Sequence, residues 1–468
     1  MLTKRLAEFV VDIRTQDMPP AVLAGARHAL IDTMGCALAG TLEPAAEIAA
    51  RWAHESSANG PATVWGRNLA TSAAEAAFAN GIATHALDFD DSLPSLRGHP
   101  STTMGPAALA VGEAAHASGA DVLAAFALGL EIAGKIGRAL GPEHYVRGWH
   151  TTATAGIFSS TTAAARLWRL NAPQLQTAWG LAASQCAGLV RNFGTMTKPF
   201  HAGYAARVGV LSAWMAQQGF TADENIFDGD NNFFSTYGGS DGTPLAATID
   251  KLGKPWEMLE PGIYVKRWPS CYCNHRPIGG MLKLIAEHGI RADEVEAVEI
   301  GFLPGSDNAL VSSDPHTGLE GKFSIEYNAA AVLLDGKLTL ESFTDPMVGR
   351  PAIRELMKKV KRYRIEAKGT FSGVVGYTDV MIATTRGRHT LRVDHAPGSP
   401  EWPMTEQDRD EKFLDCAGRV LGQPGARQLL DTLRGFETIA DIRTLVKATI
   451  PGTSTPPKAH AGLVNAAK

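Results

Sequence analysis

The chain has 468 residues, 45% hydrophobic and 20% charged, and its 44 basic and 48 acidic side chains give a formal net charge of −4. This composition is that of a folded globular protein longer than one ordinary core, and it excludes a disordered or fibrous chain. The near balance of charge, without a long run of either sign, argues against a nucleic-acid partner.

The amino-terminal stretch MLTKRLAEFVVDIRTQD lacks the apolar segment of a signal peptide, and no uncharged apolar run is long enough to cross a membrane. We therefore expect no membrane association. The five cysteines, at positions 36, 186, 271, 273 and 416, are an odd number and unlike a disulfide framework. A cytoplasmic protein is the simplest prediction, because the cytoplasm keeps thiols reduced.

Apolar residues recur at helical spacing through roughly the first 260 residues. A first amphipathic helix is predicted to end before Pro19, with an apolar face formed by Leu6, Phe9, Val10 and Ile13. The following helices are expected over 21–39, 69–86, 103–118, 120–140, 152–169, 173–187 and 202–219. Their many alanines favour helix and allow helices to approach one another closely.

The pattern changes after Pro261. Alternation predicts strands at 298–302 and 380–384, the second paired with 390–393 across a turn. Helices are expected over 277–288, 324–335, 350–359, 405–421, 425–434 and 437–447. We therefore predict a mainly α protein with an α+β part: a large all-α helical domain formed by residues 1–262 and 405–468, and a smaller α+β lid domain at 263–404.

Three polar segments interrupt the apolar helical stretches. They are HALDFDDSLPSLRGHPS (85–101), GWHTT (148–152) and RNFGTMTKPFHAG (191–203). Irregular backbone between rigid helices is a common place for catalytic groups. Together these segments bring carboxylates, imidazoles and cations, which suit proton transfer next to a carboxylate.

The first segment contains three aspartates, Asp88, Asp90 and Asp91. Divalent cations favour such oxygen ligands, but the spacing lacks the glycine and terminal glutamate of an EF-hand. We expect one aspartate to orient a histidine or a substrate hydroxyl instead. His99 comes just before an expected helix start, where its pKa is lowered and the neutral ring can act as a base.

His150 also begins an expected helix, close to backbone donors that favour an anionic ligand. Lys198 lies at the edge of the next helix in apolar surroundings, where a lysine can hold a substrate carboxylate. Arg191 and His201 belong to the same segment and are predicted to bind substrate, Arg191 as a second carboxylate clamp.

Cys271, Cys273 and His275 look like half of a zinc site, but the second ligand pair is missing. The preferred role for His275 is binding or proton transfer from the second domain. No G-x-G-x-x-G after a strand, G-x-x-x-x-G-K-[ST], H-E-x-x-H or G-x-S-x-G motif is present. We therefore predict acid–base chemistry on a small acid, without a metal or other cofactor.

In combination, DFDDS (88–92), GHPS (98–101), GWH (148–150), GTMTKP (194–199), WPSC (268–271) and FSIEY (323–327) resemble the MmgE/PrpD family. That family includes 2-methylcitrate dehydratase, cis-aconitate decarboxylase and iminodisuccinate epimerase. The resemblance implies a large all-α domain, a smaller α+β lid and a homodimer. It also implies an active site composed of Asp88, Ser92, His99, His150, Lys198, His275 and Tyr327.

The reaction implied by the resemblance starts from a carbanion next to a carboxylate, with His99 and His150 as proton carriers and Tyr327 as a proton donor. We expect a lyase, dehydratase or decarboxylase, acting on a small di- or tricarboxylate. An epimerase of an amino-dicarboxylate such as iminodisuccinate is the alternative, because most of the motifs match that branch, whereas Tyr327 matches the decarboxylase-like members. Ser92 replaces the threonine often found there. A non-catalytic carboxylate-binding protein is the alternative from another class.

Overall fold

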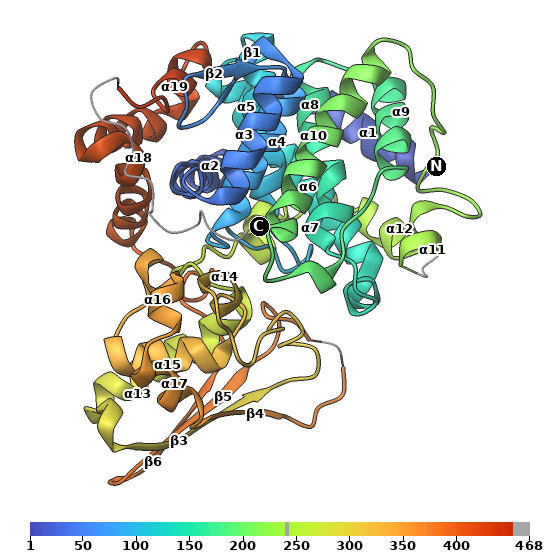
Figure 1. Cartoon of the computed structure of the whole chain (residues 1–468). Helices are drawn as coiled ribbons and strands as arrows, with labels where there is room; N and C mark the ends of the chain where they lie inside the picture. The colour runs from blue at the N-terminus through green and yellow to red at the C-terminus, as the bar shows by residue number, and fades with distance from the viewer. Residues whose placement is uncertain (239–242, 370, 453–468) are drawn as a thin grey trace, which may run out of the picture.

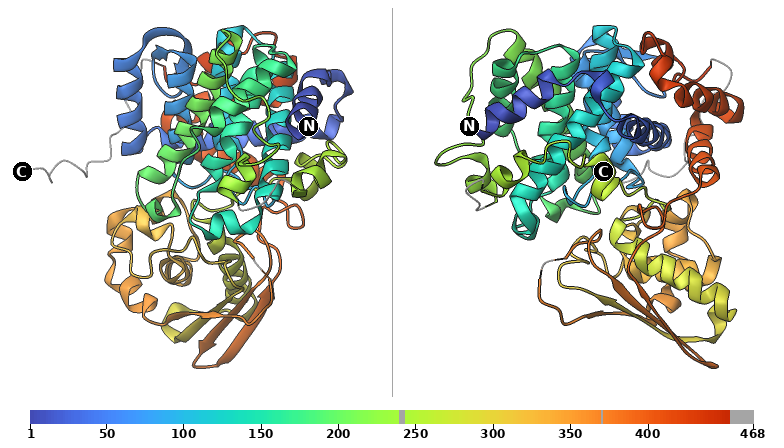
Figure 2. Two further views of the ribbon diagram at one scale, coloured as in Figure 1. Left: turned by 90° about the vertical axis from the view of Figure 1, so that its right-hand side faces the viewer. Right: turned by 180° about the vertical axis from the view of Figure 1, so that it is seen from behind.

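The computed structural model describes residues 1–238, 243–369 and 371–452, and it divides into a helical part and an α+β part, one beside the other (Figures 1 and 2). The end of the predicted 405–468 segment, residues 453–468, lies outside the described residues. Among the described helices, none has both the length and the apolar character needed to cross a membrane.

The helical part begins with two antiparallel strands and twelve helices from the first half of the chain. Their bounds are α1 (Leu2–Asp12), α2 (Pro20–Gly40), α3 (Pro44–Ser56), β1 (Ala58–Val64), β2 (Leu69–Thr71), α4 (Ala73–Ala86), α5 (Ser101–Ala115), α6 (Gly119–Val146), α7 (Thr151–Thr154), α8 (Gly156–Leu167), α9 (Ala172–Ala183), α10 (Thr197–Gln217), α11 (Phe233–Tyr237) and α12 (Thr243–Ile249). Two further helices come from the carboxyl-terminal end, α18 (Glu406–Arg434) and α19 (Arg443–Lys447).

The α+β part contains a four-stranded sheet and the helices that pack on it. Its elements are α13 (His275–His288), β3 (Val295–Phe302), α14 (Gly318–Gly321), α15 (Ile325–Asp335), α16 (Asp345–Val348), α17 (Pro351–Met357), β4 (Val360–Arg364), β5 (Thr378–Thr384) and β6 (Gly387–Val393). The strand order is β4-β3-β5-β6. β3 is parallel to β4 and antiparallel to β5. The predicted pairing of 380–384 with 390–393 is confirmed, with Val380 opposite Leu391.

Each part has its own apolar core. The core of the helical part joins both ends of the chain and includes Leu6, Leu30, Leu128, Phe413, Leu429 and Leu445. The core of the α+β part includes Ile278, Val298, Ile300, Val332 and Ile382. The predicted fold class, a large helical part with an α+β part, is confirmed. The division at residues 262/263 and 404/405 stays a prediction.

Several predicted helices begin or end elsewhere. The stretch 69–86 is a short strand followed by α4, because Thr71 pairs with β1 and Ser72 caps the helix by accepting from Glu75 N. The stretch 152–169 is divided at Ala155 into α7 and α8. α18 runs through both predicted carboxyl-terminal helices, with a break at Gly422. Helix α3 and strand β4 were not predicted.

α4 and α10 pack tightly, and this contact sets the position of the site. A Cβ on Gly81 of α4 would lie 2.8 Å from Gly203 Cα of α10, and a Cβ on Gly203 would lie 2.4 Å from Phe78 O. Only glycine permits backbones to come this close. The carboxyl-terminal end of α4 and the first turn of α10 therefore lie next to each other.

Candidate active site

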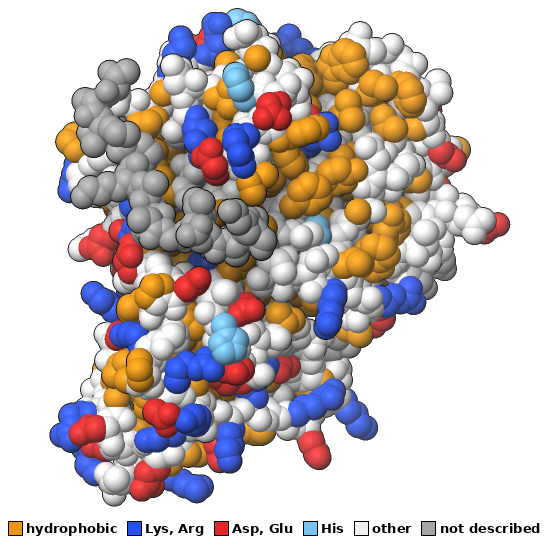
Figure 3. Space-filling model, viewed as in Figure 1, with side chains coloured by type: hydrophobic (Ala, Val, Ile, Leu, Met, Phe, Trp, Pro, Cys, Tyr) orange, Lys and Arg blue, Asp and Glu red, His pale blue; other side chains and the backbone are white. Residues whose placement is uncertain are grey.

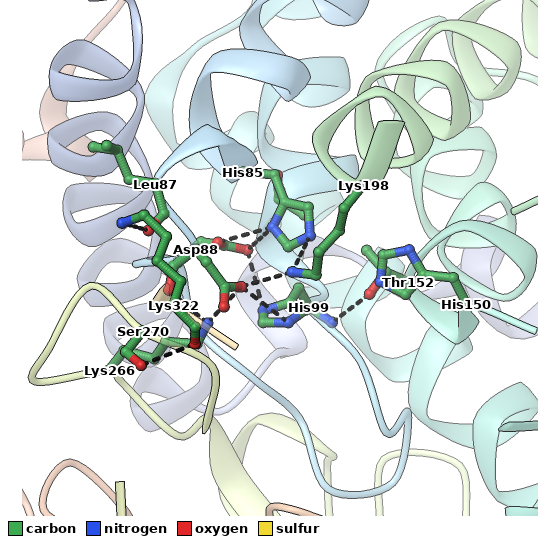
Figure 4. Close-up of polar contacts among 12 residues, drawn as sticks. His85, Leu87, Asp88, His99, His150, Thr152, Lys198, Lys266, Ser270 and Lys322 are labelled. Carbon is green, nitrogen blue, oxygen red and sulfur yellow. Dashed lines mark hydrogen bonds and ion pairs between the residues drawn. The ribbon is translucent and has the colours of Figure 1, made fainter. Parts of the chain in front are cut away.

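The three polar segments meet where the helical part faces the α+β part (Figure 4). The segment after α4 carries Asp88, Asp90 and His99, His150 lies at the amino-terminal cap of α7, and Lys198 lies in the first turn of α10. The segment after α4 is held against α7 by a hydrogen bond of 3.0 Å from His99 N to Thr152 Oγ1. A Cβ on Gly98 would lie 2.8 Å from Thr152 N, so glycine is needed at this crossing.

Asp88 is the buried anion at the centre of the site. Its Oδ1 is 2.6 Å from Lys198 Nζ and 2.9 Å from Lys266 Nζ. Burial by itself would raise the pKa of Asp88, but the two ammonium groups outweigh it and hold that pKa well below its usual range. Asp88 also has a left-handed backbone, with φ of 52°. The carboxylate is therefore ionised and fixed between two cations.

Asp90 lies between two histidines. His85 Nδ1 is 2.9 Å from both Asp90 oxygens, and His99 Nδ1 is 3.2 Å from Asp90 Oδ2 and 2.8 Å from Asp91 O. Because these oxygens only accept, each Nδ1 carries the hydrogen, and in a neutral ring Nε2 holds the lone pair. The Nε2 atom of His85 accepts from Lys198 Nζ at 2.9 Å.

Burial keeps both rings neutral. It lowers the pKa of His85 to about 3 and also lowers the pKa of His99, and Asp90 opposes it in each case. His99 Nε2 is 3.8 Å from Asp88 Oδ1, and among the described residues it has no hydrogen-bond donor. His99 thus presents an available lone pair at the cavity, as a general base requires.

His150 and His201 form a second imidazole pair. Their Nδ1 atoms are 3.1 Å apart, so one ring donates and the other accepts. Burial, and then Lys198, lower the pKa of His150 well below its usual range and that of His201 to about 4. If His150 donates, its Nε2 is a base; if it accepts, its Nε2 carries a hydrogen.

These groups line one cavity of about 70 Å³. From the helical part it is lined by Ser92, Arg97, Gly98, His99, Tyr145, His150, Thr152, Phe193 and Lys198. From the other side it is lined by Cys271, Tyr272, Cys273, Gly305, Ala309, Ser372, Gly373 and Val374. Four predicted site residues, Ser92, His99, His150 and Lys198, therefore face one cavity, and Asp88 lies directly behind Lys198.

Besides Asp88 and His201, three predicted site residues lie outside this lining. Arg191 is exposed in the short helix Val190–Asn192, and Tyr327 is buried in α15, where its hydroxyl donates to Ser342 O. His275 is fully buried behind the cavity wall; its ring stacks on Tyr272, with centroids 4.9 Å apart. The structure therefore brings none of the three to the cavity, and His201 reaches it only through His150.

Other residues of the site were missed in the sequence. His85 begins the first polar segment but had no assigned role, and Lys266 carries no motif. Lys266 is fully buried, and its partner lies 178 positions earlier in the chain. Arg97, which lines the cavity with a left-handed backbone, and Tyr145 were also given no role. The sequence signal for the burial of Lys266 is the apolar character of the residues around it.

One group of side chains has the composition of a metal site. Donor atoms of His85, Asp88, Asp90 and His99 all lie within 4.8 Å of one another. However, two ammonium groups already contact Asp88, and Lys198 also donates to His85. A cation placed among them would face two positive charges. The arrangement favours an anionic ligand instead, and the absence of a metal stays a prediction.

Comparison with known proteins matches both halves of the chain to domains of one family. The model of the MmgE/PrpD N-terminal domain matches residues 4–245, and that of the MmgE/PrpD C-terminal domain matches residues 268–437. The cis-aconitate decarboxylase of Homo sapiens is 26% identical over 465 residues, which cover 96% of this chain and 95% of that protein. The cis-aconitate decarboxylase of Aspergillus terreus is 24% identical over 468 residues, covering 95% of each chain.

Proposed function

This chain belongs to the MmgE/PrpD family, and on that premise we propose that it is a lyase that acts without a cofactor on a small tricarboxylate or dicarboxylate. Its relatives named cis-aconitate decarboxylase match nearly the whole chain, so cis-aconitate is the first substrate to test. The observation that carries the proposal is the Lys198 ammonium, which lines the same cavity as two neutral histidines, His99 and His150.

Lys198 is the proposed carboxylate-binding group. An ammonium has three N–H donors, and contacts among the described residues use two of them, one to Asp88 and one to His85. Aromatic rings of Phe193 and Phe323 lie 5.2 and 5.3 Å from Nζ and exclude water on those sides. The remaining N–H is available to a substrate carboxylate, and Arg97 supplies a second cation in the cavity lining.

The proposed decarboxylation breaks the bond between a carbon and its carboxylate, and CO2 leaves. The electron pair stays on that carbon and is delocalised towards a remaining carboxylate, where Lys198 stabilises the charge. A trianionic substrate raises the pKa of a nearby imidazole, so His150 or His99 can take a proton from solvent and deliver it to the carbon. A trianion and one proton thus give CO2 and a dianion. In a dehydration, His99 would instead remove a proton, and the β-hydroxyl would leave as water.

The paired histidines also favour a second candidate, the epimerase. An epimerase needs proton carriers on two faces of a carbon, and His99 and His150 line one cavity. We propose to separate the reactions by NMR in D2O with citrate, 2-methylcitrate, aconitate isomers, malate and iminodisuccinate stereoisomers. An alkene product or released CO2 supports the lyase. Deuteration with inversion supports the epimerase, and tight binding without either change supports a carboxylate-binding protein.

We also propose that the chain forms a homodimer through the exposed face of α10 and α3. On this face lie apolar side chains that are 37–51% exposed, namely Ile48, Trp52, Phe200, Leu211 and Trp214. In α10, Leu211 and Trp214 are three residues apart and Phe200 lies about three turns earlier, so the three side chains share one side of the helix. Figure 3 shows apolar side chains gathered on this face of the helical part. A patch of this kind marks an interaction surface, and a helical stripe can pack against its own copy.

A further inference from the structure

Three consecutive carbonyl groups in the turn after α4 each accept a hydrogen bond from a different buried lysine. The pairs are Lys322 Nζ with Leu87 O at 2.8 Å, Lys266 Nζ with Asp88 O at 2.7 Å, and Lys412 Nζ with Phe89 O at 2.9 Å. All three lysine side chains are at most 8% exposed. We refer to this group as the lysine clamp, and Figure 4 shows two of its members, Lys266 and Lys322.

The clamp holds a strained piece of backbone. α4 ends at Ala86, and two residues later Asp88 adopts a left-handed φ of 52°, which residues other than glycine rarely adopt. The carbonyls that accept these bonds belong to the cap residue Leu87 and to Asp88 and Phe89 beyond it, and buried backbone carbonyls outside a helix need partners from elsewhere. Ammonium groups at this point satisfy the carbonyls and stabilise the turn that directs the Asp88 carboxylate to Lys198.

Lys322 lies within the α+β part, whereas Lys412 belongs to α18 and Lys266 to the segment that leads into the α+β part. Lys322 is the carboxyl-terminal cap residue of α14, and its ammonium lies over the Phe343 ring, 4.6 Å from the centroid. The same ammonium donates to Pro269 O at 2.9 Å, in the segment before α13. One charged group therefore joins the α+β side of the molecule to the turn that carries Asp88.

Other contacts make this position rigid. The backbone carbonyl of Lys322 accepts from Cys271 N, Ser270 Oγ and Asn274 Nδ2, so the segment behind the cavity wall is fixed to the same residue. Burial lowers the pKa of Lys322 to about 8, which leaves the ammonium form dominant at neutral pH. Lys322 itself is absent from the cavity lining.

We propose that Lys322 is a positioning residue that locks the Asp88 turn into its active geometry when the α+β part is closed over the site. It acts through the backbone of Leu87 and Asp88 and does not touch substrate. This inference rests on the proposed function for its kinetic test. The cavity lies between the helical part and the α+β part, so the position of the α+β part decides whether Lys322 reaches the turn that carries Asp88.

The main test is Lys322→Met, which keeps the length of the side chain and removes the charge and its donors. We expect kcat to fall about 10- to 100-fold with a smaller change in KM, because a displaced catalytic group lowers the rate more than it lowers binding. Lys322→Gln, which keeps an N–H donor, should recover part of the loss. Lys337→Met, at an exposed lysine of the α+β part, is the matched control and should retain wild-type kcat.

A double-mutant cycle with Asp88→Asn distinguishes positioning from general damage. If Lys322 acts through Asp88, the double variant Asp88→Asn/Lys322→Met loses no more kcat than Asp88→Asn alone. Fully additive losses would overturn the proposal, as would a Lys322→Met enzyme within twofold of wild type. If Lys322→Met does not fold, the same cycle is carried out with Lys322→Gln.

Amide hydrogen exchange gives a readout that needs no turnover. Lys322→Met should speed exchange in peptides spanning residues 87–92 and leave α8 unchanged. If amide exchange at residues 87–92 is the same in Lys322→Met as in wild type, the proposed role of Lys322 is wrong, whatever the kinetic result. If wild type converts none of the acids while exchange at 87–92 rises, the proposed function fails and the clamp stands. If wild type is active and Lys322→Met matches it, the clamp fails and the function stands.

Discussion

Lys198 and Asp88 are 110 positions apart in the chain, yet Lys198 Nζ lies 2.6 Å from Asp88 Oδ1 in a contact between two side chains that are both nearly inaccessible to solvent. The pair joins the first turn of α10 to the turn after α4. Because Lys266 contacts the same oxygen, the carboxylate is shared by two ammonium groups and neither cation is fully neutralised. Lys198 therefore keeps positive charge for an anionic ligand at the cavity.

We expect Lys198→Met to weaken substrate binding as well as turnover. Loss of a charge-assisted hydrogen bond costs about 1.5–3 kcal/mol, which corresponds to roughly a 10- to 150-fold effect. Steady-state titration with the active acid should show a higher KM and a lower kcat. Lys358→Met, at an exposed lysine that pairs with Glu355, is a suitable control. An unchanged KM would remove Lys198 from carboxylate binding.

His150→Gln is expected to lower kcat by about 100-fold or more with a smaller change in KM, because glutamine keeps a hydrogen bond but cannot exchange a proton. When proton transfer limits the rate, a solvent isotope effect in D2O should report this step in a decarboxylation, and α-deuterated substrate should report it in a dehydration or an epimerisation. A folded His150→Gln enzyme with nearly normal kcat would show that His150 is not the proton carrier. In that case His99→Gln should carry the loss.

Because Asp91 is buried, we expect the free energy of unfolding to decrease as pH rises. Burial raises its pKa from 3.8 to about 8, and Asp90 and Asp32 add to this. The folded state thus favours the protonated acid, so the stabilisation is complete below pH 3.8 and is lost as pH rises through 8. Wild type should lose up to about 1.4 kcal/mol of unfolding free energy between pH 7 and 8, and Asp91→Asn should lose much less.

Denaturant unfolding at pH 7 and pH 8 measures this difference. The buried histidines act below their ordinary pKa of 6.5, and Lys322, with a pKa of about 8, contributes equally to both proteins, so the difference between them reports Asp91. If the free energy of unfolding changes by the same amount between pH 7 and pH 8 in wild type and in Asp91→Asn, then Asp91 is already ionised in the folded state.

Activity should survive exhaustive chelation. Lys198 contacts both Asp88 and His85, and Lys266 contacts Asp88, so a metal ion among these side chains would face two positive charges. The check is turnover after dialysis against EDTA, together with metal analysis of the active sample. Lost turnover that one added divalent metal restores would contradict this prediction.

Trp214→Glu should dissociate the proposed dimer, because a carboxylate at a side chain 47% exposed in the chain would be buried against its own copy. Light scattering coupled to size-exclusion chromatography should give one chain mass, 49.7 kDa, for the variant and twice that for wild type. Leu334→Glu, on an exposed apolar residue of the α+β part, is the control. A monomeric wild type would refute the proposal.

The parts of the site that the sequence predicted are those with local signals. Pro100 and Ser101 begin α5 as expected, which explains why His99 could be placed at a helix start. Lys266 and Lys412 could not be found in this way, because their role comes from burial against Asp88 and Phe89, far away in the chain. No rule of local spacing marks a lysine that will be buried.

The fold shows the same limit. Strand β3 was predicted because its residues alternate, whereas the neighbouring β4 was missed. β4 reads Val-Lys-Arg-Tyr-Arg, lies at the edge of the sheet and is mostly exposed after Val360. Charged side chains are common on edge strands, where they discourage pairing with other chains. β4 is therefore a strand because it pairs with β3 at the edge of the sheet, and its residue pattern alone did not indicate this.

The core of the helical part has a consequence for how the protein is made. α2 packs against α18, which is synthesised almost 400 residues later, a delay on the order of tens of seconds on the ribosome. During that interval the apolar side of α2 has no partner from the carboxyl-terminal end, whereas the α+β part is contiguous and can complete its own core first. Nascent and truncated chains should therefore depend on chaperones until residues 406–447 emerge.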